Sequence, residues 1–343
     1  MNFLGLDPVI FALIAIPVGF YLLSKGSDWL VDGASSVASK LGISPLVIGL
    51  TVVAFGTSMP EMVVSVSSAL SGNSSIAVAN AIGSNIFNVL GILGVCSLIR
   101  PIKTQSSTVW KEIPFSLAGV VVLFFLSYLS LINSSGLPGL TNAIINQTPI
   151  NGSLGLASGI ILLVFFVIYM YYTFGIANTS ETQSEEGGEV KKHSTWASVG
   201  YILAGLVLLI LGGRLTVDGA VSIAQVFGVS DRIIGLTIVA IGTSLPELIT
   251  SITATRKGND DIAMGNVVGS NIFNIFAILG ISALVGNLTV GLGEAVDMLV
   301  LVFTTLLLFG FSFIFRKYQY GKVEGAAMLA LYISYTAYLI LSR

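Results

Sequence analysis

The feature that most constrains this chain is a long internal repeat. Residues 31–94 align with residues 217–280 without a gap, at a constant offset of 186, and about 34 of the 64 aligned positions are identical. Both copies contain a GTSxPE segment followed by GSNIFN. A repeat of this length and identity indicates that the chain is built from two similar units.

The repeat lies in an unusually apolar chain. Of 343 residues, 54% are hydrophobic and only 9% are charged, and the mean hydropathy is +0.94. A soluble domain needs more charge to cover its surface, so the composition predicts an all-α integral membrane protein. We expect about ten transmembrane helices, at 9–40, 44–71, 75–98, 108–132, 153–176, 195–227, 231–256, 261–285, 294–315 and 323–342.

Five spans in each half would place the two halves in opposite orientations, and the charges of the loops agree. Loop 71–75 has no Lys or Arg, whereas its repeat partner 256–261 has two. Loop 100–111 has three basic residues, whereas its partner 286–294 has none. Because basic loops stay on the cytoplasmic side, the fold class predicted is two inverted five-helix repeats.

The domain boundaries follow from one polar segment in the middle of the chain. Residues 178–194 are rich in charge and poor in apolar side chains, which predicts a flexible linker between a first half at 1–177 and a second at 195–343. The positive-inside rule places this linker in the cytoplasm and both termini outside the cell. We therefore expect a multi-pass protein of the cell membrane.

The GTSxPE segment has the composition of an ion site. On a helix, Thr57 and Ser58 lie four and three residues before Glu61, so the three side chains can face one direction. An ionisable carboxylate inside a membrane is costly and indicates function. The prolines of the two copies should disturb the preceding turn and free backbone carbonyls as ligands. The other candidates of this kind are Thr243, Ser244 and Glu247, with the carbonyls of Ala54 and Ala240.

The second motif supplies more oxygen atoms. Asn80, Ser84 and Asn88 recur every four residues, which predicts a polar stripe along an apolar helix. Inverted repeats meet near the bilayer midplane, where both motifs should converge. The corresponding residues of the second copy are Asn266, Ser270 and Asn274.

Such a site favours hard cations. Carboxylate, hydroxyl and amide oxygens suit Ca²⁺ and Na⁺, whereas soft metals prefer thiolates and imidazoles. Two glutamates balance one Ca²⁺, or the cavity could hold several Na⁺ ions instead, as an antiporter requires. For other residues that occur in both repeats, a structural role is the favoured interpretation. We expect helix contact for the motif glycines, interhelical hydrogen bonds for Asn85 and Asn271, and capping or ion pairing for Asp32 and Asp218.

With its paired GTSMPE/GTSLPE and GSNIFN motifs, the chain resembles the cation/Ca²⁺ exchanger superfamily, most closely prokaryotic Na⁺/Ca²⁺ exchangers. The resemblance covers nearly the whole chain. It implies alternating access, in which the first and sixth helices move against a core. It also implies an ion-ligand set of Glu61, Glu247, Thr57, Ser58, Thr243, Ser244, Ser84 and Ser270, with the carbonyls of Ala54 and Ala240.

One position departs from some relatives. K⁺-dependent exchangers have an aspartate where this chain has Asn274, which is matched by Asn88 in the first repeat. The site therefore looks similar to that of K⁺-independent members. The H⁺/Ca²⁺ branch typically has a different signature around the repeat glutamates, so the resemblance favours Na⁺.

Three rival functions remain as alternatives. H⁺/Ca²⁺ antiport would use the same site, and carboxylates could also form the filter of a Ca²⁺ channel. An intramembrane hydrolase is disfavoured because the only histidine, His193, lies in the polar linker. We predict an antiporter rather than an enzyme, with no cofactor, no nucleic acid and no obligatory protein partner; its partners are Ca²⁺, Na⁺ and the lipid bilayer.

Overall fold

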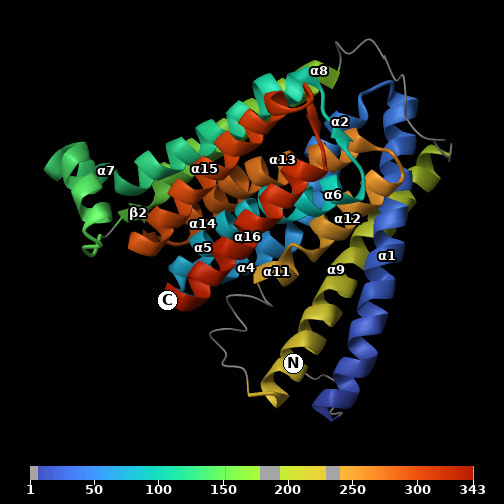
Figure 1. The fold of residues 1–343 in the computed structure, drawn as a ribbon, viewed down its shortest axis with the longest axis horizontal. Helices are drawn as coiled ribbons and strands as arrows, with labels where there is room; N and C mark the ends of the chain where they lie inside the picture. Colours follow the sequence, from blue (N-terminus) through green and yellow to red (C-terminus); the bar gives the residue numbers. More distant parts are fainter. Residues whose placement is uncertain (1–6, 151, 178–193, 229–239, 343) are drawn as a thin grey trace.

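A computed structural model describes residues 7–150, 152–177, 194–228 and 240–342 (Figure 1). The first half contains α1 Pro8–Leu41, α2 Pro45–Ile48, η1 Gly49–Val53, α3 Ala54–Thr57, α4 Met59–Leu70, α5 Ser74–Ile86, η2 Phe87–Ile92, α6 Leu93–Ile99, β1 Ile102–Lys103, η3 Thr108–Glu112, α7 Ile113–Ile145, β2 Gly152–Leu154 and α8 Leu156–Ala177. The second contains α9 Thr195–Val226, α11 Ala240–Thr243, α12 Leu245–Arg256, α13 Asp260–Phe273, η5 Asn274–Ile278, α14 Leu279–Val285, β3 Leu288–Val290, α15 Leu292–Ile314, β4 Gln319–Tyr320 and α16 Lys322–Ser342. The η segments are short π-helical turns that continue their neighbouring α-helices.

The predicted membrane helices are confirmed for the described residues. Eight helices there are long and apolar enough to cross a bilayer, and a bent pair, Pro45–Thr57 with Met59–Leu70, makes a ninth. The remaining predicted span, 231–256, is described only from residue 240 onward, as α11 and α12. The linker predicted at 178–194 lies outside the described residues except for residue 194, so the division into two halves there stays a prediction.

The structure adds two details to the predicted spans. The fourth span, Thr108–Leu129, agrees with the predicted 108–132, and helix α7 then continues to Ile145 across a break at Gly136, whose φ of 70° is left-handed and favours glycine. The fifth span begins later than residue 153, because Gly152–Leu154 forms strand β2 and pairs with β3. Two- and three-residue strands are too short to give a sequence pattern.

The helices of the GSNIFN segments form the centre of the molecule. In the most apolar windows of Asp260–Val285 and Ser74–Ile99, 89% and 78% of residues are buried, compared with 17% in Lys322–Leu341. The long helices α1 and α9 lie side by side at one edge of this core (Figure 1). The site helices are therefore surrounded by protein, while α8 and α16 present apolar side chains outward.

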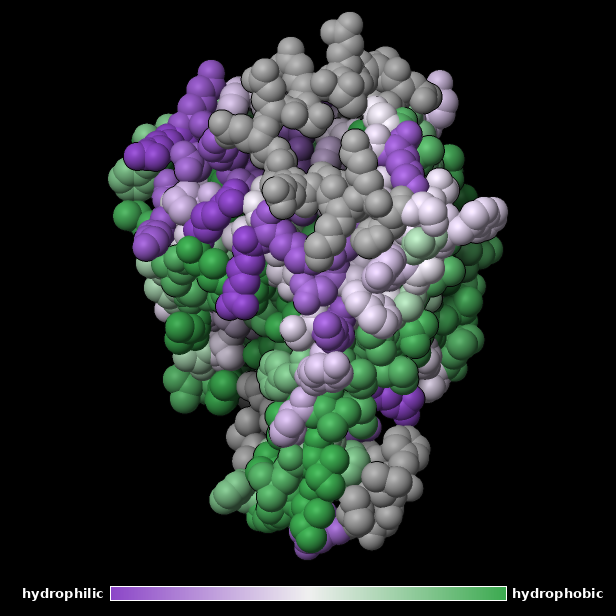
Figure 2. Space-filling view, turned by 90° about the vertical axis from the view of Figure 1, so that its right-hand side faces the viewer, coloured by the Kyte–Doolittle hydropathy of each residue, from purple (hydrophilic) through white to green (hydrophobic). Residues whose placement is uncertain are grey.

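The two ends of the molecule differ in charge. At one end, β1 pairs with β4, and Arg100 contacts Asp260 at 2.8 Å. At the other end, β2 pairs with β3, and Ser74 contacts Thr289. Figure 2 shows hydrophilic residues gathered at one end, above flanks that are largely apolar. This distribution fits a protein whose apolar flanks lie in a bilayer and whose hydrophilic end lies in water.

Candidate cation site

Both GTSxPE segments break their helix just before the glutamate. Ser58, with φ −82° and ψ 7°, separates α3 from α4, and the two parts of this span are bent by 49°. Ser244 has nearly the same backbone angles, −90° and 9°, between α11 and α12. Proline follows two residues later in both cases, at a position where a helix start tolerates it. Each glutamate thus stands in the first turn of a helix, where the helix dipole favours a negative charge.

The two segments are joined by crossed hydrogen bonds. The Ser58 hydroxyl donates to Glu247 Oε1 at 2.8 Å, and the Ser244 hydroxyl donates to Glu61 Oε1 at 2.8 Å. Ser244 also contacts the Ser84 hydroxyl at 3.1 Å. All five side chains are almost fully buried. The structure therefore brings residues that are more than 180 positions apart into one small polar cluster.

Several oxygen atoms of the predicted site have no hydrogen-bond partner among the described residues, although they are buried. They are Oε2 of Glu61 and of Glu247, the Ser270 hydroxyl, and Oδ1 of Asn88 and of Asn274. Buried polar atoms are normally paired, because leaving one unpaired costs about 1–3 kcal/mol. A bound cation would use such oxygens as ligands, so these atoms fit the predicted oxygen site.

The polar stripes also fix the position of the glutamates. Asn80 Nδ2 donates to the Glu61 carbonyl at 3.3 Å and to the Ser65 hydroxyl at 3.0 Å. In the second repeat, the Asn266 amide makes the same two bonds, to the Glu247 carbonyl at 3.2 Å and to Ser251 at 2.9 Å. The sequence motifs alone predict no role for Ser65 and Ser251. Their signal was identity in both repeats, four residues after each glutamate.

The interhelical role predicted for Asn85 and Asn271 is confirmed. Each donates from its amide to the other's backbone carbonyl, at 3.0 and 3.4 Å. Their side-chain oxygens in turn accept from the amides of Asn274 and Asn88, at 2.9 and 3.0 Å. Because the Nδ2 atoms of Asn88 and Asn274 are used in these bonds, the Oδ1 atom of each side chain points away from its asparagine partner.

The two threonines and two alanines of the predicted site belong to the same helix segments as the serine–glutamate cluster. Thr57 is buried, and its hydroxyl contacts the Val53 carbonyl at 3.1 Å and Asn266 Oδ1 at 3.0 Å. Thr243 lies within interaction range of the Glu61 carboxyl. The Ala54 carbonyl is not freed from hydrogen bonding by the proline, because it accepts the Ser58 N–H at 3.1 Å; a carbonyl has a second lone pair, so its role as an ion ligand stays a prediction. Ala240 begins α11, and there the Ser244 N–H bonds to Ile241 instead.

Glycines in the motifs allow the helices to approach closely, as predicted. A Cβ added at Gly269 would lie 2.7 Å from the Leu50 carbonyl, and one at Gly56 or Gly242 would meet Leu206 or Val217. No contact of this kind is found for Gly83 among the described residues. Asp32, for which helix capping or ion pairing is predicted, forms an ion pair with Lys257 at 2.8 Å and lies on α1 outside the cluster.

The chemistry of the cluster is that of a hard-cation site. Two carboxylates and three serine hydroxyls are joined by buried hydrogen bonds between the repeats, where an uncompensated charge would be expensive. Within the described ranges, no group of three or more His, Cys, Asp or Glu side chains could hold a metal ion, so the neutral oxygens are needed to complete a coordination shell. Fold and site together define a multi-helix membrane protein with a buried oxygen cluster between its two repeats, which is the kind of site that suits a hard cation.

Comparisons with known proteins agree. The sodium/calcium exchanger protein family model matches residues 11–175 and 197–341. The sodium/calcium exchanger MaX1 of Methanosarcina acetivorans is 32% identical over 93% of this chain and 95% of its own length. The inner membrane protein YrbG of Escherichia coli is 36% identical over 81% of each chain. The solved structure of a sodium/calcium exchanger from Methanococcus jannaschii superposes with a TM-score of 0.78 at 32% identity, covering 96% of this chain and 98% of that one. The chain belongs to the sodium/calcium exchanger family, whose members are antiporters.

Proposed function

We propose that this protein exchanges Na⁺ for Ca²⁺ across the cell membrane by alternating access, as a secondary active antiporter. The observation that carries the proposal is the crossed arrangement of Ser58 with Glu247 and of Ser244 with Glu61, which places two carboxylates in one buried cluster. Two negative charges neutralise one Ca²⁺. The same oxygens accept Na⁺, so the two ions would compete for overlapping positions.

The proposed ligands are the oxygens of this cluster. Glu61 and Glu247 would bind Ca²⁺ directly, and the unpaired oxygens of Ser270, Asn88 and Asn274 would complete its shell together with neighbouring hydroxyls. Because every one of these groups is neutral except the two glutamates, selectivity would depend on the fit of the oxygen cage rather than on extra charge. No cofactor is part of the proposed cycle.

The proposed orientation follows from the basic end of the molecule. Arg100 and Lys257 lie in loops that are close together, since Arg100 contacts Asp260 and lies next to Gly258. Lys40, in the last turn of α1, donates to Thr195 on the same side. The positive-inside rule then places this end, with the 178–194 linker, in the cytoplasm and both termini outside. The name of the related inner membrane protein is in keeping with a cell-membrane location.

The experiment that tests the proposal is ⁴⁵Ca²⁺ uptake into proteoliposomes loaded with Na⁺ and diluted into Na⁺-free buffer. A pH gradient of equal size and a condition with no gradient serve as comparisons. We expect uptake to require internal Na⁺. Uptake driven only by the pH gradient would instead establish H⁺/Ca²⁺ antiport, and uptake indifferent to both gradients would indicate a channel.

A further inference from the structure

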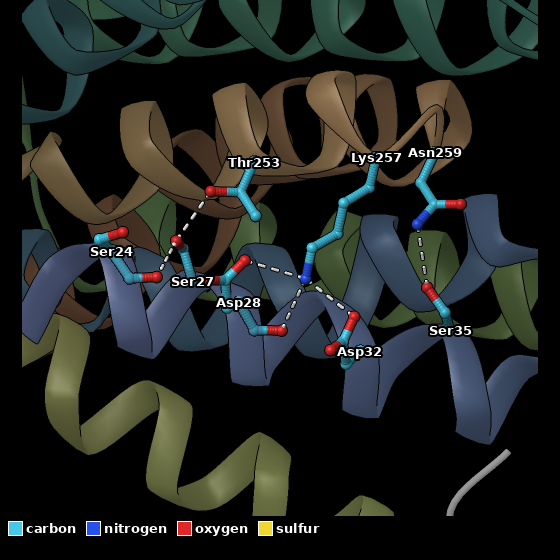
Figure 3. A network of polar contacts seen from close by, with 8 residues as sticks. All are labelled: Ser24, Ser27, Asp28, Asp32, Ser35, Thr253, Lys257 and Asn259. Atoms are coloured by element: carbon cyan, nitrogen blue, oxygen red, sulfur yellow. Dashed lines mark hydrogen bonds and ion pairs between the residues drawn. The ribbon is translucent and has the colours of Figure 1, made fainter. Parts of the chain in front are cut away.

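Lys257, which directly follows α12 at the basic end of the molecule, is bound to α1 by several contacts (Figure 3). Lys257 Nζ lies 3.0 Å from Asp28 Oδ1 and 2.8 Å from Asp32 Oδ1, and it donates to the Asp28 carbonyl at 3.2 Å. The lysine side chain is only 28% exposed. One ammonium group thus uses its three donors on two successive turns of a single neighbouring helix.

Two further bonds flank this lysine along the same interface. The Ser27 and Thr253 hydroxyls lie 2.8 Å apart on one side, and Asn259 donates to the Ser35 hydroxyl at 3.3 Å on the other (Figure 3). Together with the ion pairs, these contacts cover about two turns of α1. They attach α1 to the core helices α12 and α13, which carry the second half of the ion site.

Close packing makes α1 and α9 one structural unit. A Cβ at Gly26 would lie 2.8 Å from the Gly205 carbonyl, and one at Gly19 would lie 2.8 Å from the Gly212 carbonyl. The backbones therefore touch at intervals of seven residues, where neither helix can slide or rotate without a clash. Whatever holds α1 on the core also holds α9.

The residues of this attachment are not repeated at the corresponding positions of the other copy. At the offset of 186, Lys257 corresponds to Ser71, and Asp28 corresponds to Arg214. Ser71 donates its hydroxyl to the Ser67 carbonyl at 2.8 Å. The flanking hydroxyls are also replaced, since Ser27 and Ser35 correspond to Gly213 and Val221.

Alternating access in inverted repeats exchanges the roles of the two copies, so the opposite conformation would bring α9 onto α4. There, position 71 offers no ammonium group and position 214 carries a positive charge. The opposite conformation would thus form without an equivalent of the Lys257 ion pairs. The protein is symmetric in its ion ligands and asymmetric in this interface.

Resting on the proposed alternating access, we propose that Lys257, with Asp28 and Asp32, is a latch that holds the α1–α9 pair on the core at the basic end. It makes the conformation seen here the resting state in the absence of transported ions. The ion site, which differs little between the repeats, does not set this preference. Partly exposed ion pairs are individually weak, so removing the latch should change the ratio of the two conformations by about threefold to tenfold.

The test is a distance distribution between spin labels in the full-length protein in lipid nanodiscs, without Na⁺ or Ca²⁺. Labels on cysteines at Leu41, at the end of α1, and at Val323, at the start of α16, report the position of α1 against the core; both positions are exposed, whereas native Cys96 is buried. We expect one dominant distance in the wild type. Lys257→Gln should increase a second population, by the factor given above.

Matched variants separate the latch from a general loss of charge. Lys40→Gln removes a lysine of α1 that contacts Thr195 on α9, within the moving pair, and should leave the distribution unchanged. Lys257→Arg keeps the charge and should behave like the wild type, and Lys257→Asp combined with Asp28→Lys should restore the dominant distance. Asp32→Asn is the second variant, in case Lys257→Gln does not fold.

Identical distributions in the wild type, Lys257→Gln and Asp32→Asn would overturn the latch, as would an equal shift in Lys40→Gln. The readout contains no transport step, so these results are independent of whether Na⁺ drives Ca²⁺ uptake. Conversely, absence of Na⁺-dependent uptake with a shifted distance distribution would reject the proposed function while leaving the latch in place.

Discussion

At the scale of single residues, Glu61 and Glu247 have the same surroundings and opposite serine partners. Each carboxyl has one oxygen bonded to a serine of the other repeat and one oxygen without a partner among the described residues. Changing either to glutamine removes one of the two charges that would balance Ca²⁺ in the proposed site, while keeping the shape of the side chain. We therefore expect that neither glutamate can replace the other.

We predict that Glu61→Gln or Glu247→Gln abolishes Ca²⁺ uptake in proteoliposomes, while the purified protein keeps its thermal stability and its elution volume. Glu324→Gln is the control, because Glu324 is also buried and its Oε2 accepts the Gly321 N–H, a bond that an amide oxygen can keep. Normal uptake by both site variants would remove these glutamates from the mechanism.

Asn274 is the residue at which an added charge is most informative. Its amide donates to Asn85 Oδ1 at 2.9 Å, and its own oxygen is buried without a hydrogen-bond partner among the described residues. Asn274→Asp would add a third carboxylate and lose that donor unless the new group is protonated. We expect altered cation selectivity or a new pH dependence of uptake, measured with Ca²⁺ in competition with Na⁺, K⁺ and H⁺. Uptake identical to the wild type under all these conditions would argue against a place for Asn274 in the site.

At the scale of elements, the contact between α1 and α9 depends on the absence of side chains. A Cβ at Gly205 would lie 2.7 Å from the Gly26 carbonyl and equally close to the Leu30 nitrogen, both of them backbone atoms that cannot rotate away. Gly200 lies on the same helix, and a Cβ there would meet no atom within 4 Å. The two glycines therefore allow the same substitution to be compared in two environments.

We predict that Gly205→Ala lowers the melting temperature of the purified protein and reduces transport, because overpacking of this kind costs about 1–3 kcal/mol. Gly200→Ala should be neutral or slightly stabilising, since alanine is the better helix former. The measurement is thermal unfolding in detergent for both variants. Equal melting temperatures would show that the helix pair separates easily to make room for a methyl group.

Much of this element-scale arrangement was predictable from the sequence. The apolar stretches located nine spans to within a few residues, and the ungapped repeat predicted which helices would meet at the site. The extension to Ile145 and the short strands were not predictable, because a Gly136 break and two-residue pairings leave no periodic signal. Nor was the ion-pair partner of Asp28 predictable. Lys25 lies three residues before Asp28 on the same helix, but Asp28 forms an ion pair with Lys257, 229 positions away. Such a pairing depends on how α12 crosses α1.

At the scale of the whole molecule, the two ends are distinguished by their basic residues, which determines the proposed orientation in the membrane. Native Cys96 is the only cysteine and is fully buried, so the wild type offers little background to thiol reagents. Asn73 and Lys317 are exposed in loops at opposite ends. These positions allow orientation to be measured with one introduced cysteine at a time.

We predict that a membrane-impermeant maleimide labels Asn73→Cys in intact cells and labels Lys317→Cys only after the membrane is permeabilised. This pattern follows if the basic loops remain in the cytoplasm. The reverse pattern would invert the proposed topology without affecting the ion site. Labelling of both positions in intact cells would indicate a mixed orientation.

The crossed serine–glutamate bonds have a consequence for the ancestry of the chain. A single repeat contains a glutamate and a serine, yet its serine serves the glutamate of the other copy. An unduplicated ancestor would therefore have had an incomplete site until two copies associated upside down relative to each other. Fusion of two such genes would have fixed a one-to-one ratio of the copies and their opposite orientations. Only after fusion could the sequences at the two ends of the molecule diverge.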